Sequence, residues 1–167
     1  MVEDVAVGWH IPALSDGWSE LVDGDQLPPD SYSVVSGRDV RPHGIAQPTR
    51  YWVSRESRPP KTLAIGGDIL VRTLLSKSPD GPRVVAAVVP EGLEVAVGSN
   101  VCRLRLAPRF SADSRQLLVT WLMSSHASVE LVAHGCSRTL TAEHLLALHV
   151  PQPGPSVLTS LSELRVL

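Results

Sequence analysis

The hydrophobic period of this chain changes at Pro108, from about two residues to about 3.6. The stretch before Pro108 is rich in Val, Leu and Ala and is typical of strands. It contains three such runs, at residues 84–89, 93–97 and 101–106. Pro90-Glu91-Gly92 and Gly98-Ser99-Asn100 separate them like hairpin turns, so we expect antiparallel sheet.

Beyond Pro108, apolar residues at helical spacing predict three helices. The first has Asp113 as its expected N-cap and carries one apolar stripe, made of Leu117, Leu118, Trp121 and Leu122. The second, at 128–134, is expected to bury Val129 and Val132 and to end at Gly135. Thr141 caps the third, which runs until Pro151. The expected fold class is α+β, with a curved, mostly antiparallel sheet packed with about three C-terminal helices.

Composition indicates one cytoplasmic domain. The 167 residues suffice for one core, no apolar run is long enough to span a bilayer, and acids stand where a signal peptide carries Lys or Arg. Cys102 and Cys136 lack metal-ligand spacing and are interpreted as reduced thiols. The six histidines show no HxxxH spacing. We therefore expect no metal site and no cofactor.

The net charge of −2 conceals a strong asymmetry along the chain. Residues 1–37 contain seven acids and no Lys or Arg, whereas residues 38–115 contain thirteen basic residues and seven acids. Segment 38–61 is also rich in proline, which forbids a long helix and predicts surface loops with short strands. Residues 73–83 are expected to form a polar loop. Such asymmetry indicates a surface that faces a polyanion.

Three short signatures follow one another in the sequence: Gly67-Asp68-Ile69-Leu70, Gly135-Cys136-Ser137-Arg138 and Pro151-Gln152-Pro153. Their order, with strands and a leucine-rich helix between the first two, resembles a target-recognition domain of type I restriction-modification specificity subunits (HsdS). The resemblance covers residues 18–153. It makes residues 1–17 an acidic leader and residues 154–167 the start of a truncated connector helix or a tail.

The resemblance implies sequence-specific recognition of duplex DNA in a restriction-modification or related phage-defence system. The implied partners are DNA and methyltransferase and restriction subunits or domains, which would carry the chemistry, so the chain itself is not expected to be an enzyme. Specificity subunits of this family usually have two recognition domains joined by long helices, whereas this chain has one. It is thus either an excised domain or a stand-alone relative.

A DNA reader needs cations for phosphates and side chains that reach base edges. We expect the DNA contacts to come from the basic loops and the glycine loop, namely Arg38, Arg41, Arg50, Arg55, Arg58, Lys61, Arg72, Lys77, Arg83, Gly135, Ser137 and Arg138. The alternative for each single arginine is that it lies on a solvated surface and has no binding role. For Asp68 we expect a turn that satisfies backbone amides rather than catalysis.

Two other functions remain open from the sequence. The first is a protein-interaction module that keeps the recognition fold but has lost DNA binding, which the sparse aromatics and near-neutral charge favour. The second is an enzyme of unrecognised type. Pro28-Pro29 lacks the order of an amino-methyltransferase motif, and Pro79-Asp80 lacks the acid and lysine that complete a nuclease motif. No glycine-rich cofactor loop occurs either.

Overall fold

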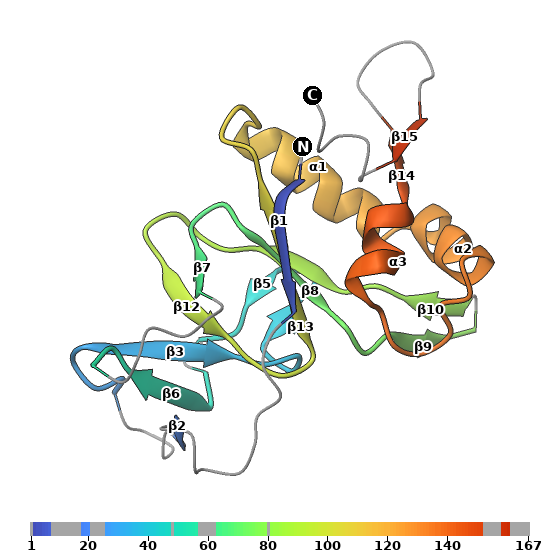
Figure 1. Ribbon diagram of the computed structural model, residues 1–167. Helices are drawn as coiled ribbons and strands as arrows, with labels where there is room; N and C mark the ends of the chain where they lie inside the picture. Colours follow the sequence, from blue (N-terminus) through green and yellow to red (C-terminus); the bar gives the residue numbers. More distant parts are fainter. Residues whose placement is uncertain are drawn as a thin grey trace.

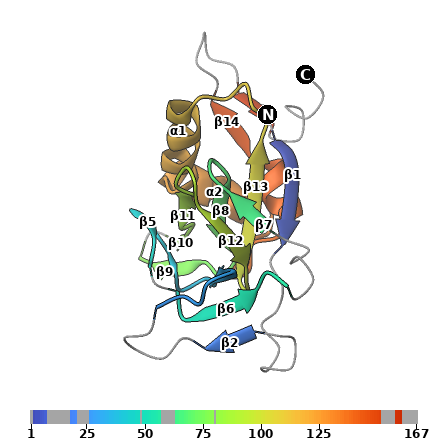
Figure 2. The ribbon, with the colours of Figure 1, turned by 90° about the vertical axis from the view of Figure 1, so that its left-hand side faces the viewer.

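The structure is a computed structural model that describes residues 2–7, 18–20, 26–47, 49–56, 63–79, 81–151 and 158–160. Two sheets and three helices make up its body (Figure 1). In the view of Figure 2, α1 lies at the upper end, β6 and β2 lie at the lower end, and β13 runs between them. No described helix is long and apolar enough to cross a membrane.

The central layer is a four-stranded antiparallel sheet with the order β1-β13-β8-β11. Its strands are β1 (Val2–Val7), β13 (Val101–Leu106), β8 (Ile69–Arg72) and β11 (Ala86–Val88). Ile69, Leu70 and Val71 are all fully buried although they alternate between the two faces of β8. Both faces of this sheet are therefore covered.

A five-stranded sheet has the order β2-β6-β3-β12-β7. Its strands are β2 (Trp18–Glu20), β6 (Tyr51–Ser54), β3 (Ser31–Val35), β12 (Glu94–Val97) and β7 (Leu63–Ile65). The pairing is antiparallel except between β12 and β3, which run parallel. Val35, Val95 and Val97 pack against Leu70 and Val101 in one cluster, which joins this sheet to one face of the four-stranded sheet.

Three short ribbons complete the strands: β4 (Val40–Arg41) with β5 (Gly44–Ile45), β9 (Ser76–Ser78) with β10 (Gly81–Arg83), and β14 (His149–Pro151) with β15 (Leu158–Ser160). All three ribbons are antiparallel. They lie outside the two larger sheets.

The helices are α1 (Ala112–Leu122), α2 (Ser125–Ala133) and α3 (Ala142–Ala147). Each begins where a hydroxyl side chain accepts a backbone N–H of the first turn: Ser111 caps α1, Ser124 caps α2 and Thr141 caps α3. Beyond α2, Gly135 takes φ +81°, a left-handed conformation that ends helices and favours glycine.

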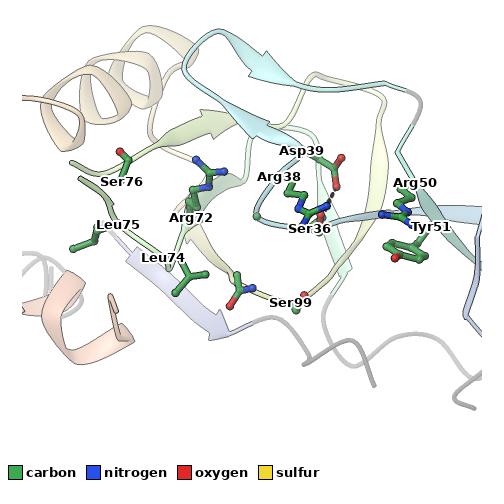
Figure 3. Close-up of a pocket in the computed structure, with 12 residues that line it drawn as sticks. Ser36, Arg38, Asp39, Arg50, Tyr51, Arg72, Leu74, Leu75, Ser76 and Ser99 are labelled. Carbon is green, nitrogen blue, oxygen red and sulfur yellow. Dashed lines mark hydrogen bonds between the residues drawn. The ribbon is translucent and has the colours of Figure 1, made fainter. Parts of the chain in front are cut away.

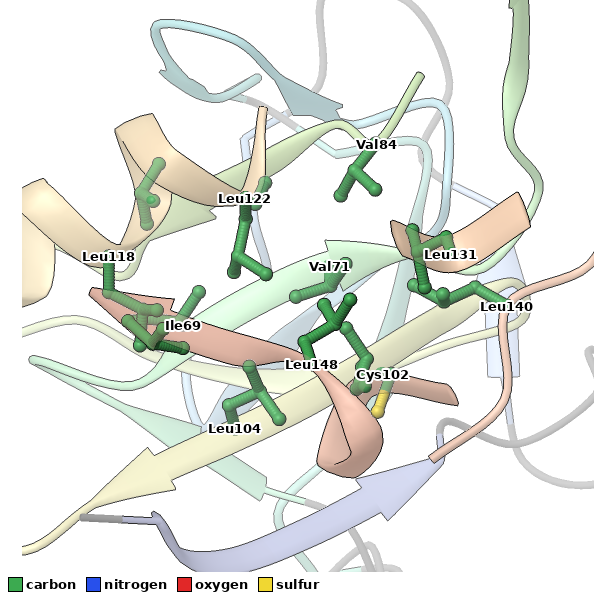
Figure 4. Close-up of a cluster of buried hydrophobic side chains, with 14 of the residues drawn as sticks. Ile69, Val71, Val84, Cys102, Leu104, Leu118, Leu122, Leu131, Leu140 and Leu148 are labelled. Carbon is green, nitrogen blue, oxygen red and sulfur yellow. The ribbon is translucent and has the colours of Figure 1, made fainter. Parts of the chain in front are cut away.

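The helices cover the other face of the four-stranded sheet and build the largest core there (Figure 4). Val71 and Leu104 of the sheet meet Leu118 and Leu122 of α1 and Leu131 of α2, all nearly or fully inaccessible to solvent. The predicted fold class is confirmed, because strands precede three C-terminal helices that pack on a mostly antiparallel sheet.

The pairing of the strands differs from the prediction. β11, β12 and β13 follow one another in the chain, yet β12 lies in the five-stranded sheet and the other two lie in the four-stranded sheet. The connections 89–93 and 98–100 therefore carry the chain between sheets instead of closing hairpins. Turn residues specify a reversal and leave the partner strand undetermined. Burial of Val95, Ala96 and Val97 requires cover on both faces of β12.

The prediction of a polar loop at 73–83 is wrong, since β9 and β10 form a hairpin there. Their side chains are half-buried or exposed, so the sequence lacks the alternation that marks a half-buried strand. Gly81 adopts φ +111° at the start of β10, which a residue with a side chain rarely adopts.

Two helical predictions also need correction. Val129 and Val132 are 68% and 52% exposed, because α2 turns the face with Ala127 and Leu131 toward the core, and the helix also begins three residues earlier than expected. The N-cap of α1 is Ser111 rather than Asp113, which lies within the first turn. In the expected stripe of α1, Leu117 is 67% exposed.

The two ends of the chain contribute strands. Within the acidic leader, β1 forms the edge of the four-stranded sheet, and residues 8–17 lie outside the described residues. Within 154–167, for which the sequence predicted the start of a connector helix or a tail, the described part is the strand β15. A stub of helix is marginal by itself, whereas pairing with β14 satisfies backbone groups of both strands. The proposed domain boundaries remain predictions.

Candidate nucleic-acid interface

A hollow of about 580 Å³ opens where the two large sheets meet the turn after β3 (Figure 3). Its walls come from four stretches of chain and consist of Ser36, Gly37, Arg38, Asp39, Arg50, Tyr51, Arg72, Leu74, Leu75, Ser76, Ser99 and Asn100. Arg38, Arg50 and Arg72, all predicted DNA contacts, line it together. Asp39 is the one acid among these lining residues.

The turn at 36–39 presents Arg38 at the rim. The Asp39 carboxylate accepts both the backbone N–H of Ser36, at 2.8 Å, and its hydroxyl, at 2.7 Å. The Asp39 N–H donates back to the Ser36 carbonyl, at 3.0 Å. These bonds close the turn without the Arg38 side chain, which is exposed. The charge of Asp39 is thus committed to holding the turn.

Backbone contacts join this turn to the opposite wall. Gly37 donates its N–H to the Ser99 carbonyl at 3.0 Å, and a Cβ at Gly37 would lie only 3.0 Å from the Asn100 carbonyl oxygen. Asn100 itself takes φ +60°, and its carbonyl accepts the N–H of Thr73 at 2.9 Å. The connections 36–39, 98–100 and 72–76 are therefore locked to one another through the main chain.

The other two arginines of the hollow differ in their surroundings. Arg72 ends β8 and is half-buried, with its backbone N–H bonded to the Val85 carbonyl. Arg50 precedes β6 and is more exposed. Its Nε donates to the Glu20 carboxylate at 2.6 Å, and its guanidinium lies 5.4 Å from the centre of the Tyr51 ring. An acid of the N-terminal segment thus reaches the basic surface directly.

The glycine loop lies beside the base of the β9–β10 hairpin. Leu75 donates its N–H to the Arg138 carbonyl at 3.0 Å, Leu140 donates to the Thr73 carbonyl at 2.7 Å, and Leu74 forms a β-bridge with Thr139. Because Leu74 and Leu75 also line the hollow, the hairpin, the glycine loop and the hollow form one continuous region. Its exposed predicted residues are Lys77, Arg83, Gly135, Ser137 and Arg138.

The remaining predicted contacts are distributed elsewhere. Arg55 follows β6, where it pairs with Glu94 at 3.1 Å and its guanidinium lies 4.2 Å from the centre of the Tyr32 ring. Arg41 is exposed at the end of β4 and does not line the hollow. Arg58 and Lys61 lie outside the described residues.

The sequence did not reveal the polar residues that surround the three arginines. Ser36, Ser76, Ser99 and Asn100 all line the hollow, and hydroxyl and amide groups of this kind bind phosphates or base edges. Gly98-Ser99-Asn100 was interpreted as a hairpin turn, so its role as a wall was missed. The available signal was a polar turn between two strands rich in apolar residues.

The Gly67-Asp68 signature has a structural role. Asp68 is 3% exposed, and its carboxylate accepts the N–H of Ile65 at 2.9 Å, which confirms the expected turn. It also receives Nε and Nη2 of Arg105, at 2.9 and 2.7 Å. Arg103 pairs with Asp4, and both arginines donate to the Leu63 carbonyl, as expected for side chains on one face of β13.

Both cysteines are free and buried. Burial raises the pKa of the Cys102 thiol to about 12, and burial likewise raises the pKa of Cys136. The neutral thiol is therefore favoured at both positions, whereas metal binding and nucleophilic attack require the thiolate.

One cluster of potential metal ligands occurs among the described residues, formed by Glu130, His134 and His149. The sequence interpretation assigned these histidines no such role. Glu130 on α2 and His134, the C-cap of that helix, are four residues apart, but His149 comes from β14, so the group of three has no signature in linear spacing.

Comparisons with known proteins place the fold. No protein-family model matches the chain, and no curated protein matches it. The crystal structure of an HsdS subunit from Thermoanaerobacter tengcongensis matches with a TM-score of 0.52 at 20% identity, over 99% of this chain and 33% of that one. This is an HsdS-like fold.

A second solved structure agrees. It concerns the complex assembly and conformational transition of the type I R-M system, and it matches with a TM-score of 0.51 at 21% identity, over 85% of this chain. The chain thus spans about a third of the length of the matched chains, 29% in one and 33% in the other. The likeness to HsdS predicted from the three sequence signatures is confirmed as a likeness of fold.

Proposed function

We propose that this chain recognises duplex DNA in a sequence-specific manner, as the specificity module of a restriction-modification or related phage-defence system. The observation that carries the proposal is the hollow, in which Arg38, Arg50 and Arg72 converge from three separate segments. Guanidinium groups bind phosphates and the major-groove edge of guanine with two parallel hydrogen bonds. The HsdS-like fold supplies the link to such a system.

The adjoining hairpin and glycine loop extend the proposed surface. Lys77, Arg83 and Arg138 would hold phosphates, while the serines and Asn100 of the hollow would approach base edges. Methyl transfer and cleavage would be carried out by partner methyltransferase and restriction subunits or domains. In this proposal the chain itself performs no chemistry.

The test is an electrophoretic mobility shift with a pool of random duplexes at low salt, followed by selection of bound sequences. Arg38→Ala combined with Arg72→Ala should weaken binding and lower the slope of log affinity against log salt by about two, because each phosphate contact contributes about 0.9. Arg109→Ala is the control, since Arg109 is exposed like Arg38 and does not line the hollow.

Unchanged duplex affinity in the double variant would show that the hollow does not bind DNA. Binding without enrichment of any sequence would remove sequence specificity and leave a general DNA-binding surface.

A protein-interaction module without DNA binding is the second candidate. Two observations favour it: Arg50 and Arg55 are paired with acids, and the helices expose Leu117, Val129 and Val132. Complete absence of duplex binding by the native chain at low salt would select this candidate over DNA recognition.

A further inference from the structure

We propose that Glu130, His134 and His149 bind a divalent transition-metal ion of the Zn²⁺ type at the point where β14 meets α2. The site borders the glycine loop, because His134 directly precedes Gly135, and none of its three residues lines the hollow. The proposal is independent of DNA recognition.

The fold brings three potential ligand atoms together. Glu130 lies on α2 and His134 is the C-cap of this helix, one turn further on, so the two side chains lie on the same side of the helix end. His149 is the first residue of β14, which follows α3. One ligand atom from each of the three side chains lies within 4.8 Å of the other two.

Hydrogen bonding explains only part of this arrangement. The His149 backbone N–H donates to Oε1 of Glu130 at 2.8 Å, and Nδ1 of His149 contacts the same oxygen. Nε2 of His134 lies 3.9 Å from that oxygen, which is too far for a hydrogen bond. Nε2 of His134 thus lies close to the other two ligand atoms without a hydrogen bond to the Glu130 oxygen.

The spacing fits a shared ion. Zn²⁺ bonds imidazole nitrogen and carboxylate oxygen at about 2.0–2.2 Å in tetrahedral geometry, so two ligand atoms on one ion lie about 3.3–3.6 Å apart. Nε2 of His134 lies 3.9 Å from the Glu130 oxygen and all three ligand atoms lie within 4.8 Å of one another, so small rotations of these partly exposed side chains would bring them onto one ion. The contact of His149 with Glu130 would open slightly as Nδ1 turned from the oxygen to the ion.

The donor set selects the class of metal. Two imidazole nitrogens and one carboxylate suit Zn²⁺, Co²⁺ or Ni²⁺, whereas Ca²⁺ and Mg²⁺ prefer oxygen ligands alone. The three side chains are 22%, 38% and 48% exposed for Glu130, His134 and His149, so an ion reaches them without opening the core. Water would complete the coordination. The bound ion would fasten the β14–β15 ribbon to α2.

The experiment titrates the tag-free 167-residue protein with Zn²⁺ by calorimetry, with Co²⁺ as a spectroscopic probe of the coordination. We expect one ion per chain and visible Co²⁺ bands that disappear on addition of Zn²⁺. His134→Ala and His149→Ala should each weaken binding at least about tenfold, since loss of even an outer partner of a metal ligand costs that much. His126→Ala is the control, being an exposed histidine on the same helix.

Both altered histidines are exposed, so the variants should fold, and circular dichroism checks this. Glu130→Gln supplies a further variant that keeps the size of the side chain and an acceptor for the His149 N–H. Absence of saturable Zn²⁺ binding to the native chain would overturn the proposal. Equal loss of affinity in the His126 control and the ligand variants would do the same.

Discussion

Two groups of arginines in this molecule differ in the contacts of their guanidinium groups. Arg103 and Arg105 project from β13 onto Asp4, Asp68 and the Leu63 carbonyl, and their charges are committed to the fold. Arg38 and Arg72 line the hollow. The turn that carries Arg38 is closed by hydrogen bonds between Ser36 and Asp39, not by the arginine side chain. The basic excess of residues 38–115 thus combines structural cations with candidate ligand-binding cations, and only three-dimensional contacts separate them.

Asp68→Ala should have the largest effect, on stability. The substitution removes a buried acceptor from the Ile65 N–H and the partner of Arg105, and breaking such a pair costs about 3–5 kcal/mol. Urea denaturation measures the loss. Asp68→Asn keeps an acceptor and should be milder. A loss below about 1 kcal/mol for the Ala variant would mean that Arg105 is not a structural cation.

Arg72→Ala should lower stability by only about 1 kcal/mol, through lost packing of its half-buried side chain, yet weaken duplex binding about tenfold. The hollow offers Arg72 to a ligand, whereas no ion pair within the described residues depends on it. Denaturation and a mobility shift on the same sample separate the two effects. A stability loss comparable with that of Asp68→Ala would erase the distinction between the two groups.

Glu20→Gln should strengthen duplex binding slightly, by about twofold to fivefold. The exposed pair with Arg50 contributes about 0.2–1 kcal/mol, and DNA must displace Glu20 before a phosphate can take its place. Fluorescence anisotropy at low salt resolves such a change. The gain should vanish in an Arg50→Ala background, and a gain that persists there would assign it to general charge reduction.

Arg55→Ala should have the smallest effect on DNA binding, less than about twofold, although the sequence placed Arg55 among the DNA contacts. Its guanidinium already pairs with Glu94, lies over Tyr32 and stands outside the hollow. Exposed pairs of this kind contribute little to stability. A tenfold loss of affinity would extend the interface across the five-stranded sheet and reverse the assignment.

Local features were predictable from the sequence, and long-range ones were not. Thr141 as a cap, Gly135 as a helix end and Asp68 as a turn residue depend on neighbours within a few positions, and all three are confirmed. The switch of period at Pro108 likewise gave the fold class. Each of these features is written in residues that are adjacent along the chain.

The pairing of β12 with β3 joins segments about sixty residues apart, and no local signal encodes it. The sequence did not predict the hollow for the same reason, because its three arginines line one hollow only after the two sheets pack together. The predicted buried face of α2 was wrong because apolar residues lie on both sides of this helix, Val129 and Val132 on one and Ala127 and Leu131 on the other, and only tertiary packing selects the buried side. The convergence of His149 on Glu130 also depends on tertiary structure.

The closed turn at Ser36 and Asp39 has an evolutionary consequence. Its hydrogen bonds, and the backbone contact of Gly37 with Ser99, leave the side chain at position 38 without a structural duty. Substitutions there can change the chemistry offered at the rim while the scaffold stays the same. A protein with such a turn can acquire a new ligand preference through single substitutions at position 38, without first passing through unstable intermediates.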